Sequence, residues 1–141
     1  MLASRLLATA IMCRPTPRQA PRALATRMQF ISSIPGLPDH LQEMHEQITS
    51  GEAQLYDVRE PGEHAQGMLA CSSPVPLSML QEGMFSNSDF LDKTKITYLH
   101  CAAGIRVHPA AACLQEMGFE RVIPLQEGYG SLASLGFPLE E

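Results

Sequence analysis

A short apolar run that ends close to a cysteine constrains this 141-residue chain most strongly. Residues 96–99 are Ile-Thr-Tyr-Leu, a composition that predicts a buried strand, and Cys101 follows shortly after it. Helical spacing resumes beyond Pro109. A strand that leads through a tight loop into a helix directs backbone N–H groups and the positive helix end toward the end of the strand. These surroundings stabilise a thiolate, so the pattern favours a reactive cysteine over one more buried thiol.

The loop that follows Cys101 supports this interpretation. Its residues are Ala102, Ala103, Gly104, Ile105 and Arg106. The small residues leave the backbone to surround the sulfur, and the arginine adds a fixed cation at the rim. We expect the five loop amides to face the sulfur in a shallow, open bowl. The loop is one residue shorter than the Cys-x5-Arg loop with which cysteine phosphatases hold a phosphate, which disfavours a phosphatase or an arsenate reductase.

Together these residues resemble the single-domain rhodaneses, or rhodanese-like sulfurtransferases, in which a strand, Cys-x-x-Gly-x-Arg and a helix follow one another. Cys101, Gly104 and Arg106 stand at the motif positions. Other segments that look like the family, in the right order, are Asp57-Val58-Arg59-Glu60-Pro61, Gly67, Pro76-Leu77-Ser78, Gly118-Phe119, Gly128-Tyr129 and Gly136-Phe137-Pro138. The likeness covers residues 30–139.

The expected fold is α/β and rhodanese-like, with a mostly parallel central sheet of about five strands and helices on both faces. The segments expected as strands are 30–34, 54–58, 75–77, 96–99 and 122–125. An apolar stripe between Leu37 and Ile48 predicts a helix that ends at Gly51. Pro109 disfavours helical geometry at the residue before it, which predicts a late start for the helix after the loop.

The resemblance implies a sulfurtransferase that uses no cofactor and no metal. Cys101 would take a sulfane sulfur from a donor such as thiosulfate, hold it as a persulfide, and pass it to cyanide or to a small or protein thiol. Ala102 to Arg106 would bind the donor, with Arg106 on its oxyanion. Asp57, which could accept backbone N–H groups or pair with Arg59, would have a structural role, as would Arg59 itself.

An alternative is a catalytically weak, rhodanese-like binding or regulatory module. Ala102 and Ala103 favour it, because they replace the polar or basic loop residues usual in relatives, and Pro109 adds to the argument. An ordinary thiol pKa at Cys101 would support this alternative.

Several other polar residues are given structural or surface roles. We interpret Glu60 and Glu63 as a solvated turn. Cys71 is either a thiol that resolves a persulfide on the loop cysteine or an apolar filler, and we favour the filler. His40 and His45 are expected to be solvated and not to bind a metal. His108 could contact an anionic substrate, but we favour a plain surface position for it.

The first 27 residues differ in composition from the rest. They contain five arginines, and no acidic residue precedes Asp39. This composition predicts an organellar transit peptide over 1–27, mitochondrial or alternatively plastid, followed by the folded domain over 28–141. The formal net charge of −5 includes those five arginines, so the remainder carries −10, which disfavours nucleic acid as a partner. No apolar run is long enough to cross a bilayer, and the four cysteines lack paired spacing, which favours a reducing compartment.

Overall fold

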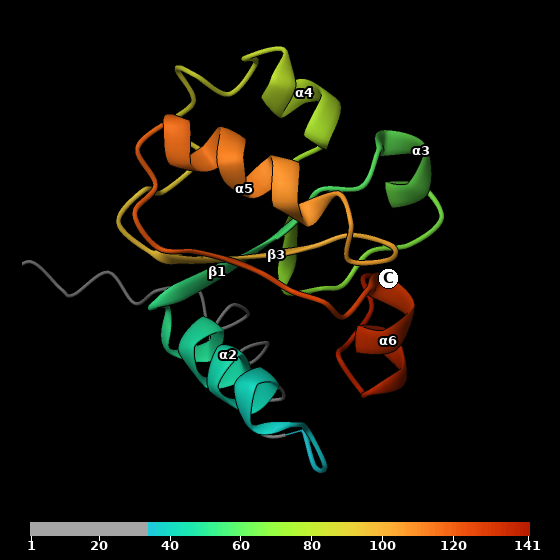
Figure 1. The fold of residues 1–141 in the computed structure, drawn as a ribbon. Coiled ribbons are helices and arrows are strands. Elements are labelled where there is room, and N and C mark those ends of the chain that lie inside the picture. The colour runs from blue at the N-terminus through green and yellow to red at the C-terminus, as the bar shows by residue number, and fades with distance from the viewer. Residues whose placement is uncertain (1–33) are drawn as a thin grey trace, which may run out of the picture.

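The computed structural model describes residues 34–141 (Figure 1). The predicted transit peptide and the first part of the predicted opening strand, Phe30 and Ile31, lie outside the described residues. The elements are α2 (Asp39–Ser50), β1 (Ala53–Asp57), α3 (Pro61–His64), β2 (Ser72–Pro74), α4 (Leu77–Gln81), β3 (Ile96–His100), α5 (Val107–Glu116), β4 (Val122–Pro124) and α6 (Tyr129–Ser134). Within this range no helix is long and apolar enough to span a membrane.

The described strands form one parallel sheet in the order β2-β1-β3-β4. This confirms the mostly parallel α/β architecture; three of the expected strands are found where predicted, and the fourth strand of the sheet is β2. The edge strand β2 comes earlier than predicted. Val75 still donates its N–H to the Asp57 carbonyl at 2.9 Å, but Pro76 has no N–H and instead precedes the first residue of α4.

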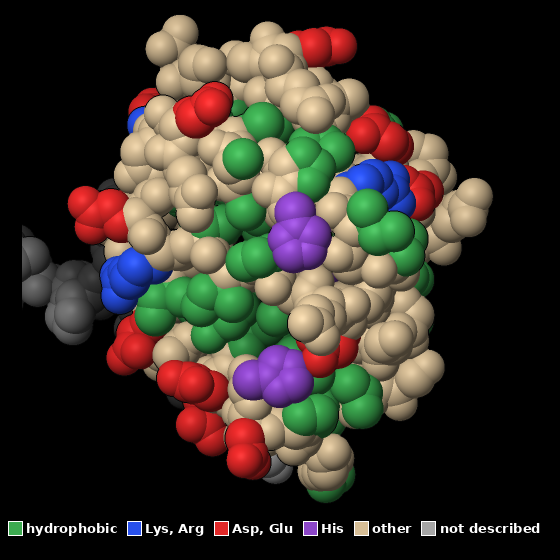
Figure 2. All heavy atoms as spheres, viewed as in Figure 1, with side chains coloured by type: hydrophobic (Ala, Val, Ile, Leu, Met, Phe, Trp, Pro, Cys, Tyr) green, Lys and Arg blue, Asp and Glu red, His purple; other side chains and the backbone are tan. Residues whose placement is uncertain are grey.

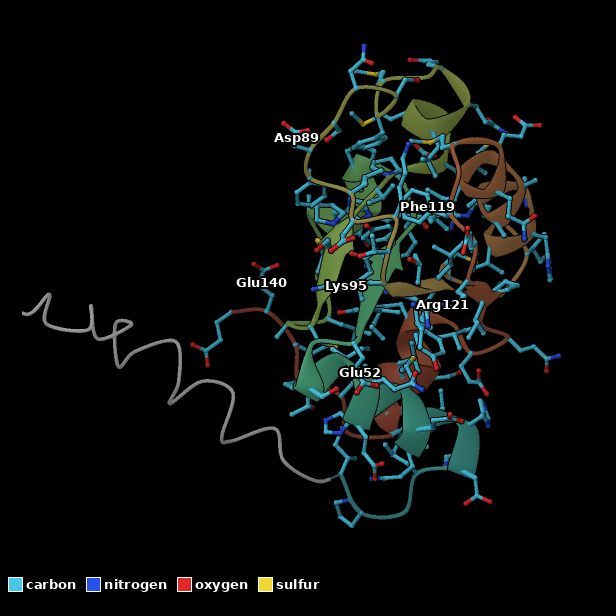
Figure 3. All side chains as sticks on the ribbon, turned by 90° about the vertical axis from the view of Figure 1, so that its left-hand side faces the viewer. Glu52, Asp89, Lys95, Phe119, Arg121 and Glu140 are labelled. Carbon is cyan, nitrogen blue, oxygen red and sulfur yellow. The ribbon has the colours of Figure 1, made fainter. Side chains whose placement is uncertain are left out.

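Helices cover both faces of the sheet, as predicted (Figures 1 and 3). Side chains that alternate along each strand enter two separate cores. Tyr56 and Leu99 pack toward α4 and α5, whereas Leu55 and Tyr98 pack toward α2 and α6. Phe119, labelled in Figure 3, is buried in the first core with its ring edge-on to Tyr56 at a centroid distance of 6.4 Å.

The helix that follows the cysteine loop begins at once, at Val107, so the predicted late start is wrong. Pro109 falls within the first turn, where backbone N–H groups have no partner inside the helix and the missing donor costs little. Helical bonding is already established at the next residue, because Ala110 donates its N–H to the Arg106 carbonyl at 3.2 Å.

The sheet register places the carboxyl ends of β1 and β3 side by side. Asp57 ends β1 and lies opposite His100, which ends β3. The residues that leave these strands, Val58 and Cys101, therefore emerge at the same edge of the sheet. This is where the predicted site residues converge.

Candidate active site

The loop after β3 surrounds the sulfur of Cys101 with backbone. The Gly104 N–H donates to Cys101 Sγ at 3.1 Å. Burial raises the pKa of the Cys101 thiol, but the loop amides together lower it more, so that the pKa lies below its ordinary value. These amides belong to Ala103, Arg106, Gly104 and Ile105. The site therefore favours a thiolate.

Two details of the predicted bowl differ in the structure. The amide of Ala102 is not among the groups that lower the pKa of the cysteine. The bowl is also covered, because Cys101 is only 1% exposed. The loop residues around it, Ala102, Ala103 and Ile105, are themselves exposed.

The loop rests on the segment before α6 through backbone contacts. Tyr129 donates its N–H to the Cys101 carbonyl at 2.8 Å. A Cβ atom on Gly128 would collide with the carbonyl of Ala102. Gly104 has a φ of +75°, and a Cβ there would lie 2.6 Å from the Gln126 carbonyl oxygen. These two glycines therefore let the two segments approach closely enough to fix the loop.

Asp57 and Arg59 form a buried ion pair next to this loop. Arg59 donates from Nε to both carboxylate oxygens and from its backbone N–H to Oδ1, each at 3.0 Å, and a terminal nitrogen reaches Oδ2 at 2.7 Å. Arg59 also binds the Gly67 carbonyl at 2.7 Å and lies over the Tyr129 ring at 4.0 Å. Burial raises the pKa of Asp57, but the hydrogen bonds and charge of Arg59, together with His100, lower it more. The pair thus links β1 to the segment that supports Cys101.

Two histidines lie beside the same carboxylate. His64 Nε2 is 3.4 Å from Asp57 Oδ1, and His100 Nε2 is 3.7 Å from Oδ2. His100 is fully buried, and neither of its ring nitrogens has a hydrogen-bond partner among the described residues. Burial is the main cause that lowers the pKa of His100 to about 4, although Asp57 opposes it. His100 is therefore neutral at neutral pH. Nothing in the sequence pattern indicated this cluster.

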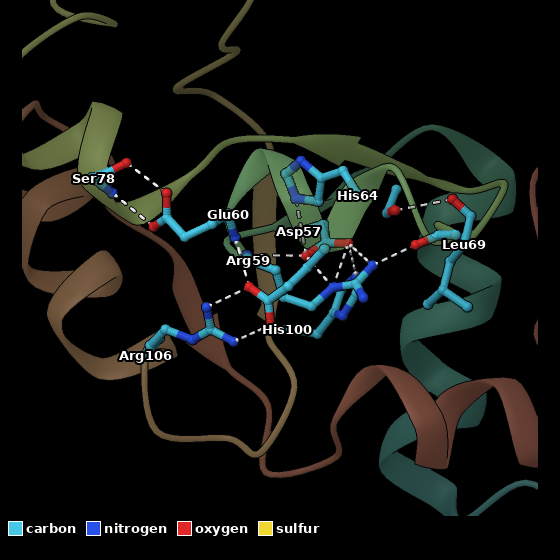
Figure 4. Close-up of polar contacts among 11 residues, drawn as sticks. Asp57, Arg59, Glu60, His64, Leu69, Ser78, His100 and Arg106 are labelled. Atoms are coloured by element: carbon cyan, nitrogen blue, oxygen red, sulfur yellow. Dashed lines mark hydrogen bonds and ion pairs between the residues drawn. The ribbon is translucent and has the colours of Figure 1, made fainter.

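The guanidinium of Arg106 is paired with a carboxylate and is not free to bind a donor alone. It binds Glu63 through two nitrogens, at 2.6 and 2.8 Å (Figure 4). The Glu63 carboxylate also accepts the Glu60 N–H at 2.9 Å, and Glu60 binds the Ser78 hydroxyl at 2.7 Å. The turn is therefore more than the predicted solvated turn, because both carboxylates bind protein groups although the Glu63 side chain is 35% exposed. Their spacing, with Pro61 between them, is a capping-box pattern that could have revealed this.

The other singled-out residues lie apart from the loop. Cys71 packs in the α2 and α6 core, across the sheet from Cys101, and burial raises its pKa to about 11, which supports the role of filler. His108 is exposed, and His40 contacts Glu127 at 2.7 Å. His45 is 3% exposed, so its predicted solvation is wrong. No cluster of metal ligands occurs among residues 34–141.

Comparisons with known proteins agree with this arrangement. The model of the rhodanese-like domain family matches residues 40–134. A sulfurtransferase of Allochromatium vinosum is 31% identical over 85 residues, which are 60% of this chain and 76% of that protein. The fold and the cysteine loop define a small α/β domain with a backbone-lined thiol. The chain belongs to the rhodanese-like domain family.

Solved structures show the same fold. A rhodanese-related protein of Thermoplasma volcanium is 29% identical, with a TM-score of 0.55 over 69% of this chain and 90% of that one. A human single-domain sulfurtransferase is similar in fold, with 23% identity and a TM-score of 0.55 over 67% of this chain and 92% of that one.

The contact beneath the loop predicts a difference between two neighbouring glycines. Gly128→Ala should lower the free energy of unfolding by about 2 kcal/mol, because its Cβ displaces the Ala102 carbonyl. Gly130→Ala is the matched control, since its Cβ would meet nothing within 4 Å in α6. It should be neutral or slightly stabilising. Urea denaturation of the two variants tests this, and equal stabilities would contradict the proposed contact.

The burial of His100 predicts a pH-dependent loss of stability. Its pKa of about 4 in the folded state lies below the ordinary histidine value, so the unfolded chain binds a proton first as pH falls. As pH falls from about 6.5 to about 4, the free energy of unfolding should therefore decrease by about 3 kcal/mol in total. Below that range His100 causes no further change.

His100→Leu should remove most of this slope at little cost, because no hydrogen bond within the described residues is lost. Burial also lowers the pKa of His45, which leaves a smaller slope in the same direction. The exposed His108 provides the control, and His108→Leu should keep the wild-type slope. Urea unfolding at a series of pH values measures both. A slope as steep in His100→Leu as in the wild type would show that another group is responsible.

Proposed function

We propose that this protein is a sulfurtransferase that carries a sulfane sulfur on Cys101. The donor is a small molecule such as thiosulfate, and the acceptor is cyanide, a small thiol or a protein thiol. Membership of the rhodanese-like family and the relative that is a sulfurtransferase support transfer of sulfur groups in general. The persulfide, the donor and the acceptors are inferred from the chemistry of the site.

The observation that carries the proposal is the set of loop amides around one sulfur. Four consecutive backbone N–H groups, from Ala103 to Arg106, lower the pKa of Cys101 despite its burial. The same donors can stabilise the outer sulfur of a persulfide, which is also an anion. Preorganised donors of this kind lower a barrier by about 3 kcal/mol each when they face the charge that develops.

The reaction has two steps. The thiolate of Cys101 attacks the outer sulfur of thiosulfate; a new S–S bond forms, the S–S bond of the donor breaks, and sulfite leaves with the electron pair. The enzyme then holds a persulfide anion. In the second step a nucleophile such as cyanide attacks the outer sulfur and restores the thiolate, giving thiocyanate. Because the enzyme alternates between two covalent forms, ping-pong kinetics are expected.

A binding or regulatory module is the second candidate. The covered position of Cys101, which is 1% exposed, favours it, because a donor must reach the sulfur past the loop. The neutralisation of Arg106 by Glu63 also favours it, since the guanidinium is not free to hold an oxyanion. The two candidates differ in whether sulfur is gained at Cys101.

Intact-mass measurement separates these candidates. After incubation with thiosulfate or methanethiosulfonate, the wild-type protein should gain one sulfur, and a thiol should then remove it. Cys101→Ser should gain none. Cys71→Ser is the control that should behave as the wild type, because Cys71 packs on the opposite side of the sheet. Wild-type protein that gains no sulfur from either donor would leave only the binding module.

The reactivity of Cys101 should depend on pH in the direction its pKa shift predicts. The rate of alkylation by iodoacetamide follows the thiolate, so its midpoint should lie below the ordinary thiol value of about 8.5. The Cys101→Ser variant supplies the background from the other thiols. A midpoint at or above the ordinary value would contradict stabilisation of the thiolate by the loop.

A further inference from the structure

The carboxylate of Glu63 holds the one cation of the cysteine loop. Arg106 NH1 lies 2.6 Å from Oε2 and NH2 lies 2.8 Å from Oε1, a bidentate geometry. The side chains of Arg106 and Glu63 are 32% and 35% exposed, so both are partly open to solvent. The hydrogen bond to Glu63 is the main cause that raises the pKa of Arg106, and the charge of Cys101 raises it further, so the pair lies close enough to the sulfur to act on an anionic donor.

Glu63 is itself held in place. Its Oε2 accepts the N–H of Glu60, and the Glu60 carboxylate accepts both the N–H and the hydroxyl of Ser78. The hydrogen bond from Arg106 is the main cause that lowers the pKa of Glu63 to about 2. The carboxylate thus stays ionised at neutral and mildly acidic pH, and the pair persists there.

The pair changes what Arg106 can offer a donor. Three of the five N–H groups of the guanidinium are not used by Glu63, so hydrogen bonding to a donor remains feasible. The net charge of the pair is zero, however, and an approaching anion meets the carboxylate as well as the cation. The chain carries −5 overall, and acidic side chains are scattered over the face shown in Figure 2, so the net charge of the protein also disfavours a doubly charged anion.

We propose that Glu63 is a specificity-determining residue that sets the charge of the sulfur donor. By neutralising Arg106 it disfavours doubly charged donors such as thiosulfate and favours sulfane-sulfur donors with one negative charge or none, such as organic thiosulfonates and persulfides. The inference rests on the proposed function, because it concerns which donor loads Cys101. With a neutral persulfide R–S–SH, the thiolate attacks the outer sulfur, the donor S–S bond breaks, and R–S⁻ leaves with the electron pair.

Removal of the Glu63 charge should therefore act on one donor more than on another. In Glu63→Gln the KM for thiosulfate should fall about tenfold, while the KM for the monoanion methanethiosulfonate changes by less than about threefold. The kcat values should change little. The KM of the variant for thiosulfate should also rise more steeply with ionic strength than that of the wild type, because salt screens the freed cation.

Two further variants show whether Glu63 acts through its negative charge or only by supporting the structure of the turn. Glu60→Gln removes a carboxylate from the same turn that binds Ser78 and not Arg106, and should keep the wild-type ratio of KM values for the two donors. Glu63→Asp keeps the charge and should restore that ratio. Thermal unfolding of all variants shows whether each is folded in the assay.

The outcomes are distinguishable. If Glu63→Gln changes both KM values equally, or lowers kcat for both donors without changing their KM ratio, Glu63 only braces the loop and the inference is overturned while the sulfurtransferase stands. If the wild type gains no sulfur on Cys101 from either donor, the proposed function itself fails. A selective fall in the thiosulfate KM, reversed by Glu63→Asp, supports the inference.

Discussion

The close approach of two backbone segments is the constraint on which the site depends. The loop after β3 can turn its amides toward Cys101 only if its outer side is supported without intervening side chains. Gly128 provides that support at the Ala102 carbonyl, and Gly104 turns the loop against residue 126. The N–H of Tyr129 then closes the contact at the Cys101 carbonyl. The chemistry of the sulfur is therefore determined by packing between the loop and the start of α6.

The buried ion pair extends this support into the sheet. Arg59 binds Asp57 at the end of β1 and lies over the ring of Tyr129, so it connects the strand ends with the segment beneath the loop. Breaking such a pair by removal of one partner is costly, because the other charge stays buried. His100, neutral and without a hydrogen-bond partner among the described residues, lies 3.7 Å from the Asp57 carboxylate and directly precedes the cysteine. The interior near the site thus contains polar side chains, and the ion pair holds Asp57 and Arg59 in one arrangement.

Sequence reasoning reached the parts of this structure that depend on local pattern. The strand that ends before Cys101, the parallel sheet and the helices on both faces follow from periodicity and from family likeness. Contacts between distant segments were not accessible. The pairing of Arg106 with Glu63 joins positions 43 residues apart, and the capping-box spacing concerns only Glu60 and Glu63. The approach of Gly128 to Ala102, like the burial of His45, depends on tertiary packing that no single-sequence period encodes.

The exposed loop side chains have a consequence for how such a domain can diversify. The amides that hold the sulfur anionic belong to the main chain, whereas the side chains of Ala102, Ala103 and Ile105 face outward. Exchanges at these three positions can alter which molecules are admitted without altering the ionisation of the nucleophile. One scaffold could thus be retuned toward new sulfur carriers by evolution or by design, with the reactive centre inherited unchanged.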